Sequence, residues 1–230
     1  MKRFLAGILA LGLILSLTAC KEASAEKQVF AMDTVMMLTA YGDQSEEALK
    51  AAELELYRLD SLLSKTDEGS TVSALNGAAG AATTVEGEVL ELLELAKVYS
   101  GETGGAFDIT ISPVVSAWGF TEDAYRVPDE AELKELLSSV GSERIKLNGD
   151  TAVLEQGTEI DLGGIAKGYA SDRVAEIFRS YEISRGTVVL GGNALAAGTR
   201  EDGQAWRVGI RDPKNSEGLA GLIHLEDAYA

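Results

Sequence analysis

The sequence contains only one cysteine and one histidine, and this scarcity excludes several kinds of active site. With Cys20 alone, no disulfide can form within the chain. Cys20 and His224 cannot supply a Ser-His-Asp or Cys-His set for nucleophilic catalysis, nor a zinc site built from cysteines and histidines. His224 lies in the apolar stretch Leu219 to Leu225, so we interpret it as structural.

Positive charge is also scarce. The 20 lysines and arginines face 37 aspartates and glutamates, which gives a formal net charge of −17. Loss of the two positive charges of Lys2 and Arg3 with a leader peptide would make it about −19. Such a charge repels polyanions, so nucleic acid is excluded as a partner, and a diphosphate ligand needs local cations or a metal. The 46% apolar and 6% aromatic content is typical of one globular domain or two small ones.

The chain has a single long apolar run, Phe4 to Leu17, which follows two basic residues. The run is too short to span a bilayer permanently, so it predicts a signal peptide. It ends at Leu17-Thr18-Ala19-Cys20, which resembles the bacterial lipobox, where the chain is cut before the cysteine and the sulfur is diacylated. The alternative is an uncleaved anchor, or an ordinary signal peptide with an incidental cysteine.

This pattern predicts a signal peptide at 1–19, a lipidated Cys20 with a polar tether at 20–28, and a folded domain at 29–230. We therefore expect a bacterial lipoprotein that carries palmitate. A lipid anchor would hold it at the cell membrane, facing outside the cytoplasm.

Apolar spacing predicts four helices, and alternation with β-branched enrichment predicts the strands. The helices are expected from Ser45, as N-cap, to Leu63, at Glu88 to Tyr99, at about Asp129 to Val140, and at Ile165 to Phe178. The strands are expected at Val29 to Tyr41, Arg144 to Leu147, Thr151 to Glu155, Thr187 to Leu190, Trp206 to Ile210 and Leu219 to Leu225, with a short one ending at Ile160-Asp161. We expect a loop from Ser64 to Asn76 and a type I′ turn at Asn148-Gly149. Because helices and strands come in runs, the pattern favours an α+β fold over a doubly wound parallel sheet.

The densest candidate for chemistry is the segment from Ile160 to Asp172, where a strand end meets glycines and a helix start. Bare backbone N–H groups and the positive end of a helix dipole suit an anion there, and Lys167 adds a cation. The spacing matches neither the Walker pattern nor the dinucleotide fingerprint. The alternative is a tight turn with a solvated lysine.

Two further segments are rich in glycine. Gly104 to Thr110 would let a planar ring approach the backbone, and Asp108 would accept hydrogen bonds from a ring or ribose. The alternative is a glycine-ended helix entering a strand, with Phe107 and Trp118 as core aromatics. The other segment, Leu190-Gly191-Gly192-Asn193, is a strand that runs into glycines.

Seven sets of residues, taken in order, closely resemble the FAD:protein FMN transferase family, also called the ApbE-type flavin transferases. The sets are Met32-Asp33-Thr34; Leu63-Ser64 with Ser70, Ser73 and Asn76; Gly105-Ala106-Phe107-Asp108; Trp118-Gly119-Phe120; Asp161-Leu162-Gly163-Gly164-Ile165-Ala166-Lys167-Gly168; Gly191-Gly192-Asn193; and Trp206-Arg207-Val208-Gly209-Ile210 with Asp212-Pro213. Each set alone is a weak pattern, but seven in register make a strong one.

The resemblance implies a T-fold-like α+β protein, with a mixed or antiparallel sheet and packed helices, that binds FAD with a divalent metal, usually magnesium. It also implies transfer of FMN to a threonine hydroxyl of an exported or membrane acceptor protein, with release of AMP. By position it assigns flavin contacts to Met32, Ala106, Phe107, Asp108, Asp161 and Lys167, and a metal ligand to the carbonyl of Gly164. Asp161 and Lys167 are the expected catalytic residues.

Two departures from the family pattern stand out. Thr66 lies where many members carry a tyrosine that stacks on the dinucleotide, so Thr66 joins the cofactor-binding positions and FAD pyrophosphatase activity is an alternative. The family's late histidine and its Asp and Thr metal ligands have no counterpart before Ala230. We therefore expect a chain that lacks the C-terminal part of the domain, and a non-catalytic flavin-binding lipoprotein is the alternative from another class.

Overall fold

The computed structural model describes residues 22–120 and 124–229, without the side chains of Ser216 and Tyr229. The predicted signal peptide and the lipidation site at Cys20 lie outside these residues. Within them, no helix is both long and apolar enough to cross a membrane.

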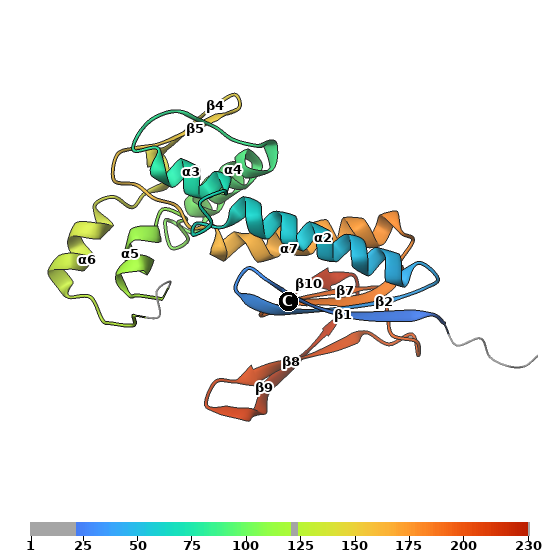
Figure 1. The fold of residues 1–230 in the computed structure, drawn as a ribbon. Coiled ribbons are helices and arrows are strands. Elements are labelled where there is room, and N and C mark those ends of the chain that lie inside the picture. Colours follow the sequence, from blue (N-terminus) through green and yellow to red (C-terminus); the bar gives the residue numbers. More distant parts are fainter. Residues whose placement is uncertain (1–21, 121–123, 230) are drawn as a thin grey trace, which may run out of the picture.

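The fold is built on a five-stranded antiparallel sheet with two helices packed on one face (Figure 1). The strands, in sheet order, are β1 (Ser24–Ala31), β2 (Thr34–Tyr41), β6 (Arg185–Leu190), β7 (Asn193–Ala197) and β10 (Ala228–Tyr229). The helices α2 (Ser45–Leu63) and α7 (Gly163–Ser180) lie side by side over this sheet. We call these seven elements the sheet layer.

Alternation and helical spacing explain why the sheet layer forms. On β2, Met36, Leu38 and Ala40 are buried while the residues between them are more exposed. On α2, the buried residues Leu49, Ala52, Leu56, Leu59 and Leu63 form the apolar stripe that meets this face. The predicted helix is confirmed, but Gln44 is its N-cap and Ser45 is its first residue.

The prediction of one strand from Val29 to Tyr41 is wrong, because β1 and β2 form a hairpin. Its turn is Met32-Asp33, and both residues have positive φ, 50° and 56°, as a type I′ turn requires. The turn contains no glycine or asparagine, so it lacks the residues that usually indicate a hairpin. Since β1 begins at Ser24, the predicted tether at 20–28 is also wrong from that residue onward.

The remaining helices form a second region, the helical lobe, which we define as residues 64–162. It contains α3 (Thr71–Gly77), α4 (Gly87–Glu102), α5 (Ser112–Ala117), α6 (Glu130–Leu137), the 3₁₀ turn η1 (Ser142–Arg144) and a three-stranded sheet of β3 (Thr83–Thr84), β5 (Thr151–Leu154) and β4 (Ile145–Asn148). Figure 1 shows the lobe beside one end of α2 and α7.

Several predictions for the lobe need correction. The expected loop from Ser64 to Asn76 contains α3, whose N-cap Ser70 accepts a hydrogen bond from the backbone N–H of Ser73. The predicted β4–β5 hairpin is confirmed, but its turn is Gly149-Asp150, and only Gly149 has a positive φ. A type I′ turn requires positive φ at both residues, so that assignment is wrong. Ile160 and Asp161 lie outside any strand, and Glu159 forms an isolated parallel bridge with Ile111.

The chain closes with β8 (Trp206–Asp212) and β9 (Asn215–Leu225), a hairpin on the side of the sheet away from α2 and α7 (Figure 1). Strand β7 is buried on both faces. Its Leu195 belongs to the large core, whereas Ala194 and Ala196 pack with Leu225 of the hairpin. The large core runs without interruption from Leu38 and Leu56 of the sheet layer to Leu92 of the lobe, so these two regions share one core.

Candidate functional site

The N-terminal end of α7 is the centre of the candidate site. The backbone N–H of Asp161 donates to the carbonyl of Ile109 at 2.8 Å, which fixes the chain just before the helix. Asp161 Oδ1 in turn accepts the backbone N–H of Gly163, also at 2.8 Å. The predicted junction of glycines and a helix start is confirmed. Asp161 lies at this junction, and its side chain accepts a hydrogen bond from one of the first-turn N–H groups that have no partner within the helix.

The loop with Ala106, Phe107 and Asp108 lies against this first turn. A Cβ built on Gly164 would come within 3.1 Å of Phe107 Cε2, so a side chain there would require the ring to shift by a few tenths of an ångström. Phe107 is half-buried and packs edge-on against Tyr99, with ring centroids 6.3 Å apart. Two of the candidate segments are therefore neighbours, although they lie far apart in the sequence.

Asp108 is engaged within its own loop. Its Oδ1 accepts hydrogen bonds from the backbone N–H of Thr110 at 2.9 Å and from Thr110 Oγ1 at 2.6 Å, and its Oδ2 accepts one from Ser100 Oγ at 3.2 Å. These bonds hold the loop after α4 in shape. A direct hydrogen bond from Asp108 to a ligand stays a prediction.

Lys167 meets the third candidate segment. Leu190 pairs with Asn193, so Gly191 and Gly192 form the β6–β7 turn. A Cβ on Gly191 would come within 3.4 Å of Lys167 Cε and 2.9 Å of Thr34 Oγ1. The lysine, this turn and the start of β2 therefore meet on one side of α7.

Met32 forms part of the β1–β2 turn just before Thr34. Its backbone N–H donates to Asp60 Oδ1 of α2 at 3.0 Å, which anchors the turn to the helix. Met32 is therefore held two residues before Thr34, which approaches Gly191, and its contact with a flavin stays a prediction.

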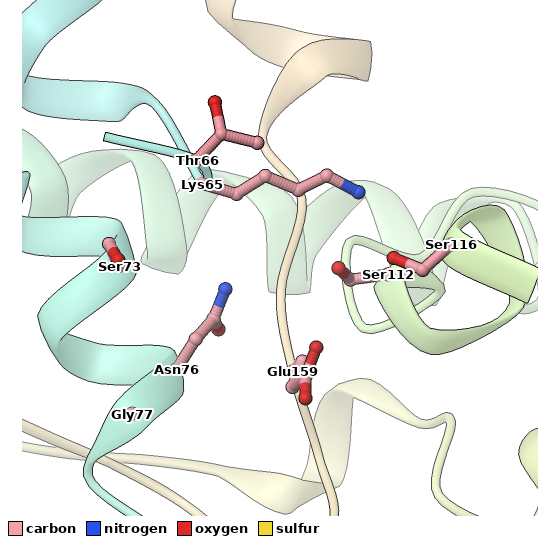
Figure 2. A pocket seen from close by; sticks show the side chains of 8 residues that line it. All are labelled: Lys65, Thr66, Ser73, Asn76, Gly77, Ser112, Ser116 and Glu159. Atoms are coloured by element: carbon pink, nitrogen blue, oxygen red, sulfur yellow. The ribbon is translucent and has the colours of Figure 1, made fainter. Parts of the chain in front are cut away.

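A cavity of about 330 Å³ lies between α3 and α5 (Figure 2). Its lining residues are Lys65, Thr66, Ser73, Asn76, Gly77, Ser112, Ser116 and Glu159. Asn76 clamps the backbone of Ile160, since its Nδ2 donates to the carbonyl at 3.0 Å and its Oδ1 accepts the N–H at 2.8 Å. Thr66 lines this cavity, and a threonine has no aromatic ring that could stack on a ligand.

Sequence reasoning missed Lys65. The side chain is only 15% exposed, and its Nζ lies 2.9 Å from Asp161 Oδ2. A lysine in a polar loop carries no pattern that distinguishes it from a solvated lysine, so no sequence signal could have found it.

A second cavity, of about 530 Å³, lies between α4, α7 and β7, on the α7 face that carries Ile165 and Gly168. Its lining residues are Leu95, Tyr99, Ile165, Gly168, Tyr169, Ser171, Asp172, Asn193 and Ala194. The Tyr169 hydroxyl donates to Glu88 Oε1 at 3.0 Å, and burial raises the pKa of this phenol.

A charged cluster joins α2, α4 and α7 beside this cavity. Arg58 binds Glu55 at 2.8 Å and Glu88 at 2.6 Å, and Arg173 binds Glu55 at 3.2 Å. The hydrogen bonds from Arg58 lower the pKa of both glutamates. These contacts connect the sheet layer to the lobe through side chains.

A metal ion finds too few donors in residues 22–120 and 124–229. No group of three His, Cys, Asp or Glu side chains there could hold one. Gly164, expected to offer its carbonyl, lies in the first turn of α7. One carbonyl does not make a magnesium site, which usually has six oxygen ligands, so the described residues do not by themselves fit the metal.

The geometry first indicates a class of protein: an α+β protein in which a lysine and a helix N-terminus lie beside glycine-containing turns. This arrangement is suited to a phosphate-bearing ligand. The chain belongs to the ApbE family, whose sequence model it matches over residues 32–230. It is 29% identical to a FAD:protein FMN transferase of Treponema pallidum over 83% of this chain, and 30% identical to one of Klebsiella pneumoniae over 84%.

Solved structures agree with this assignment. The ApbE protein of Thermotoga maritima aligns with a TM-score of 0.84 and 28% identity, covering 90% of this chain and 69% of its own. The flavin transferase ApbE of Vibrio cholerae aligns with a TM-score of 0.77 and 26% identity, covering 84% of this chain and 65% of its own. The predicted ApbE-type α+β fold is confirmed. The chain spans 58% and 61% of the Treponema and Klebsiella relatives.

Proposed function

We propose that this protein transfers FMN from FAD to a threonine hydroxyl of an acceptor protein. The observation that carries the proposal is the meeting of Lys167, Gly191 and Thr34 near the α7 N-terminus, with Phe107 on its first turn. Relatives that share 29% and 30% of their aligned residues with this chain are named FAD:protein FMN transferases.

In the proposed reaction, the threonine oxygen forms a bond to the FMN phosphorus and gives up its proton. The bond from that phosphorus to the bridging oxygen breaks, and AMP leaves with that oxygen, which takes up the proton released by the threonine. Lys167 offers a cation for the diphosphate in a strongly acidic protein, and the N-terminal turn of α7 adds its dipole. We propose that Met32, Ala106 and Phe107 contact the flavin.

Magnesium dependence is part of the proposal and rests on family resemblance. Its contribution would be to offset charge on the diphosphate. We assign no step to it, because Gly164 is the single donor expected among the described residues. Titration of FAD into the protein with and without magnesium tests this part separately.

The central test is incubation of the protein with FAD, magnesium and an acceptor that carries a flavinylation threonine. Flavin fluorescence of the acceptor band in a gel and release of AMP are the expected results. An acceptor in which that threonine is replaced by alanine should show no flavin fluorescence. A protein that yields neither a fluorescent acceptor nor AMP contradicts the proposal.

Lys167→Met is the matched active-site variant, and Lys146→Met is its control. Lys146 is an exposed lysine of β4 that pairs with Glu155 at 3.3 Å. Loss of the Lys167 cation should reduce transfer by at least about tenfold, as removal of one positioned charge stabiliser does in other sites. Lys146→Met should leave transfer unchanged.

Thr66 supports a second candidate, hydrolysis of FAD to AMP and FMN. A threonine offers no ring to stack on the dinucleotide, and it borders the 330 Å³ cavity. AMP release without acceptor would identify this activity. Thr66→Tyr should then shift the products from free FMN towards labelled acceptor.

We also propose that a lipid on Cys20 holds the protein at the cell membrane outside the cytoplasm, near exported acceptors. Support comes from the sequence of the leader alone. Mass measurement of the N-terminal peptide tests lipidation. Cys20→Ala should move the protein from the membrane fraction to the soluble fraction, and an unchanged distribution contradicts the anchor.

A further inference from the structure

Lys65 is a lysine at the candidate site to which the resemblance to the family assigns no role. Its Nζ is closed off from solvent and makes no hydrogen bond of acceptable geometry within the described part of the chain. The nearest counter-charge is Asp161 Oδ2, at 2.9 Å. A buried ammonium is costly unless a paired charge compensates it, so Lys65 depends on Asp161 staying where it is.

Asp161 is held on its other side by backbone. Its N–H donates to Ile109, and its Oδ1 accepts from Gly163. Only Oδ2 is left for Lys65, so the two oxygens of one carboxylate connect the α7 N-terminus to the loop after α2. If the carboxylate rotated, it would leave both the Gly163 N–H and the Lys65 ammonium without it.

The loop that carries Lys65 is itself well fixed. Ser64 Oγ accepts the N–H groups of Thr66 and Asp67 at 3.2 and 3.0 Å, and Asp67 Oδ1 accepts that of Gly69 at 2.9 Å. Ser70 Oγ closes the loop by donating to the carbonyl of Ser64. Lys65 therefore extends from an ordered backbone, which is what a side chain needs if it is to position another.

Glu159 is the competing partner, because its carboxylate lines the same cavity. Figure 2 shows Lys65 crossing above the cavity with its Nζ directed towards Ser112 and Ser116, while Glu159 lies on the far side. Glu159 is exposed and can be solvated, whereas Asp161 is within ion-pair distance.

We propose that Lys65 is a positioning residue: it fixes the Asp161 carboxylate at the N-terminus of α7 and thereby sets the affinity for the flavin dinucleotide. The part on affinity rests on the proposed function. The ion pair itself does not, and the two parts are tested separately.

The first test is chemical labelling of lysines with acetic anhydride, read by peptide mass spectrometry without any ligand. Lys65 should be protected in the parent protein and several-fold more reactive in Asp161→Asn, because the side chain loses its counter-charge. Glu159→Gln should leave Lys65 protected, and Lys146 should react in every variant. Equal labelling of Lys65 in the parent and Asp161→Asn, or exposure of Lys65 by Glu159→Gln, overturns the ion pair.

The second test is a double-mutant cycle on FAD affinity with Lys65→Met and Asp161→Asn. Lys65→Met should weaken binding about tenfold in the parent, which is within the coupling range of contacting charges, and hardly at all in the Asp161→Asn background. Lys65→Arg should restore much of the affinity, while thermal unfolding confirms that each variant is folded.

The outcomes separate the two proposals. Unchanged affinity in Lys65→Met, or an equal loss in both backgrounds, overturns positioning through Asp161. A parent protein that shows the protected lysine but binds no FAD contradicts the proposed function, and it overturns the claim on affinity while the ion pair stands.

Discussion

The sheet layer and the helical lobe are ordered by different kinds of contact. In the sheet layer, strand pairing and an alternating apolar pattern determine where each residue lies, as on β2. In the lobe, single side chains bind distant backbone. Asn76 holds Ile160, and Lys97 donates to the carbonyls of Ser142 and Ile145 at 2.6 and 2.9 Å. The candidate site lies where the two regions meet, and each contributes one half of it.

The largest expected effect comes from a cavity in the shared core. Leu38→Ala removes a fully buried side chain from β2 and should lower the free energy of unfolding by about 3 kcal/mol, as large-to-small core substitutions do. Thr39→Ala, one residue further on, should cost much less. Urea unfolding measures both values.

The same variant tests whether the two regions unfold together. Trp118 reports on the lobe and Trp206 on the hairpin that packs against the sheet. Since the core is continuous, Trp118→Phe and Trp206→Phe versions of Leu38→Ala should show coincident transitions. Separate midpoints for the two tryptophans would show that the sheet layer and the helical lobe unfold as two units, which contradicts a shared core.

This difference between the regions explains what the sequence could predict. Periodicity found α2, α4, α6, α7 and most strands, because their residues face one core in a regular pattern. It missed α3, which depends on the Ser70 cap, and the turn at Met32-Asp33, whose positive φ values are held by the rest of the hairpin. Short elements fixed by single contacts leave no period to read.

The candidate site divides in the same way. Gly163, Gly164 and Gly191 could be singled out, because glycine marks places where backbone must approach closely. The hydrogen bonds by which Asp108 holds its own loop could not be predicted, because they depend on the positions of Thr110 and Ser100 in the fold. The pairing of Lys65 with Asp161 joins residues far apart in the chain, and only the fold brings them together.

The next largest effect is expected at the clamp between the lobe and the site. Asn76→Ala leaves the buried N–H and carbonyl of Ile160 without their partner and should cost about 2 kcal/mol. It should also weaken FAD binding, because Asp161 follows Ile160. Ser73→Ala, in the same cavity, is the control. If urea unfolding shows equal losses for the two variants, the clamp is not what orders this segment.

The charged cluster makes a smaller, pH-dependent contribution. Arg58 lowers the pKa of Glu55 and Glu88 in the folded protein, so the stabilisation is fully present above the unfolded pKa near 4.5. It is lost as the pH falls through the lower folded values. Since these side chains are partly exposed, we expect about 1 kcal/mol or less.

Glu88→Gln tests this link between α4 and α2. Its unfolding free energy should fall less steeply than that of the parent protein as the pH is lowered from about 5 to 3, as measured by urea titration at each pH. Glu94→Gln, an exposed position on the same helix, should keep the parent slope. If the unfolding free energy of Glu88→Gln depends on pH as steeply as that of the parent protein, the cluster does not connect the two regions energetically.

The smallest effect is a contrast between two glycines of α7. Replacing glycine by alanine within a helix usually adds about 1 kcal/mol of stability, and a methyl group on Gly168 would meet nothing within 4 Å. On Gly164 it would meet the Phe107 ring at 3.1 Å, so the ring must move and part of the gain is lost. Gly168→Ala should therefore be more stable than Gly164→Ala by a few tenths of a kcal/mol, measured by urea unfolding. Equal gains would mean that the Phe107 loop yields freely, so that the lobe's half of the site is held less firmly than the sheet layer's half.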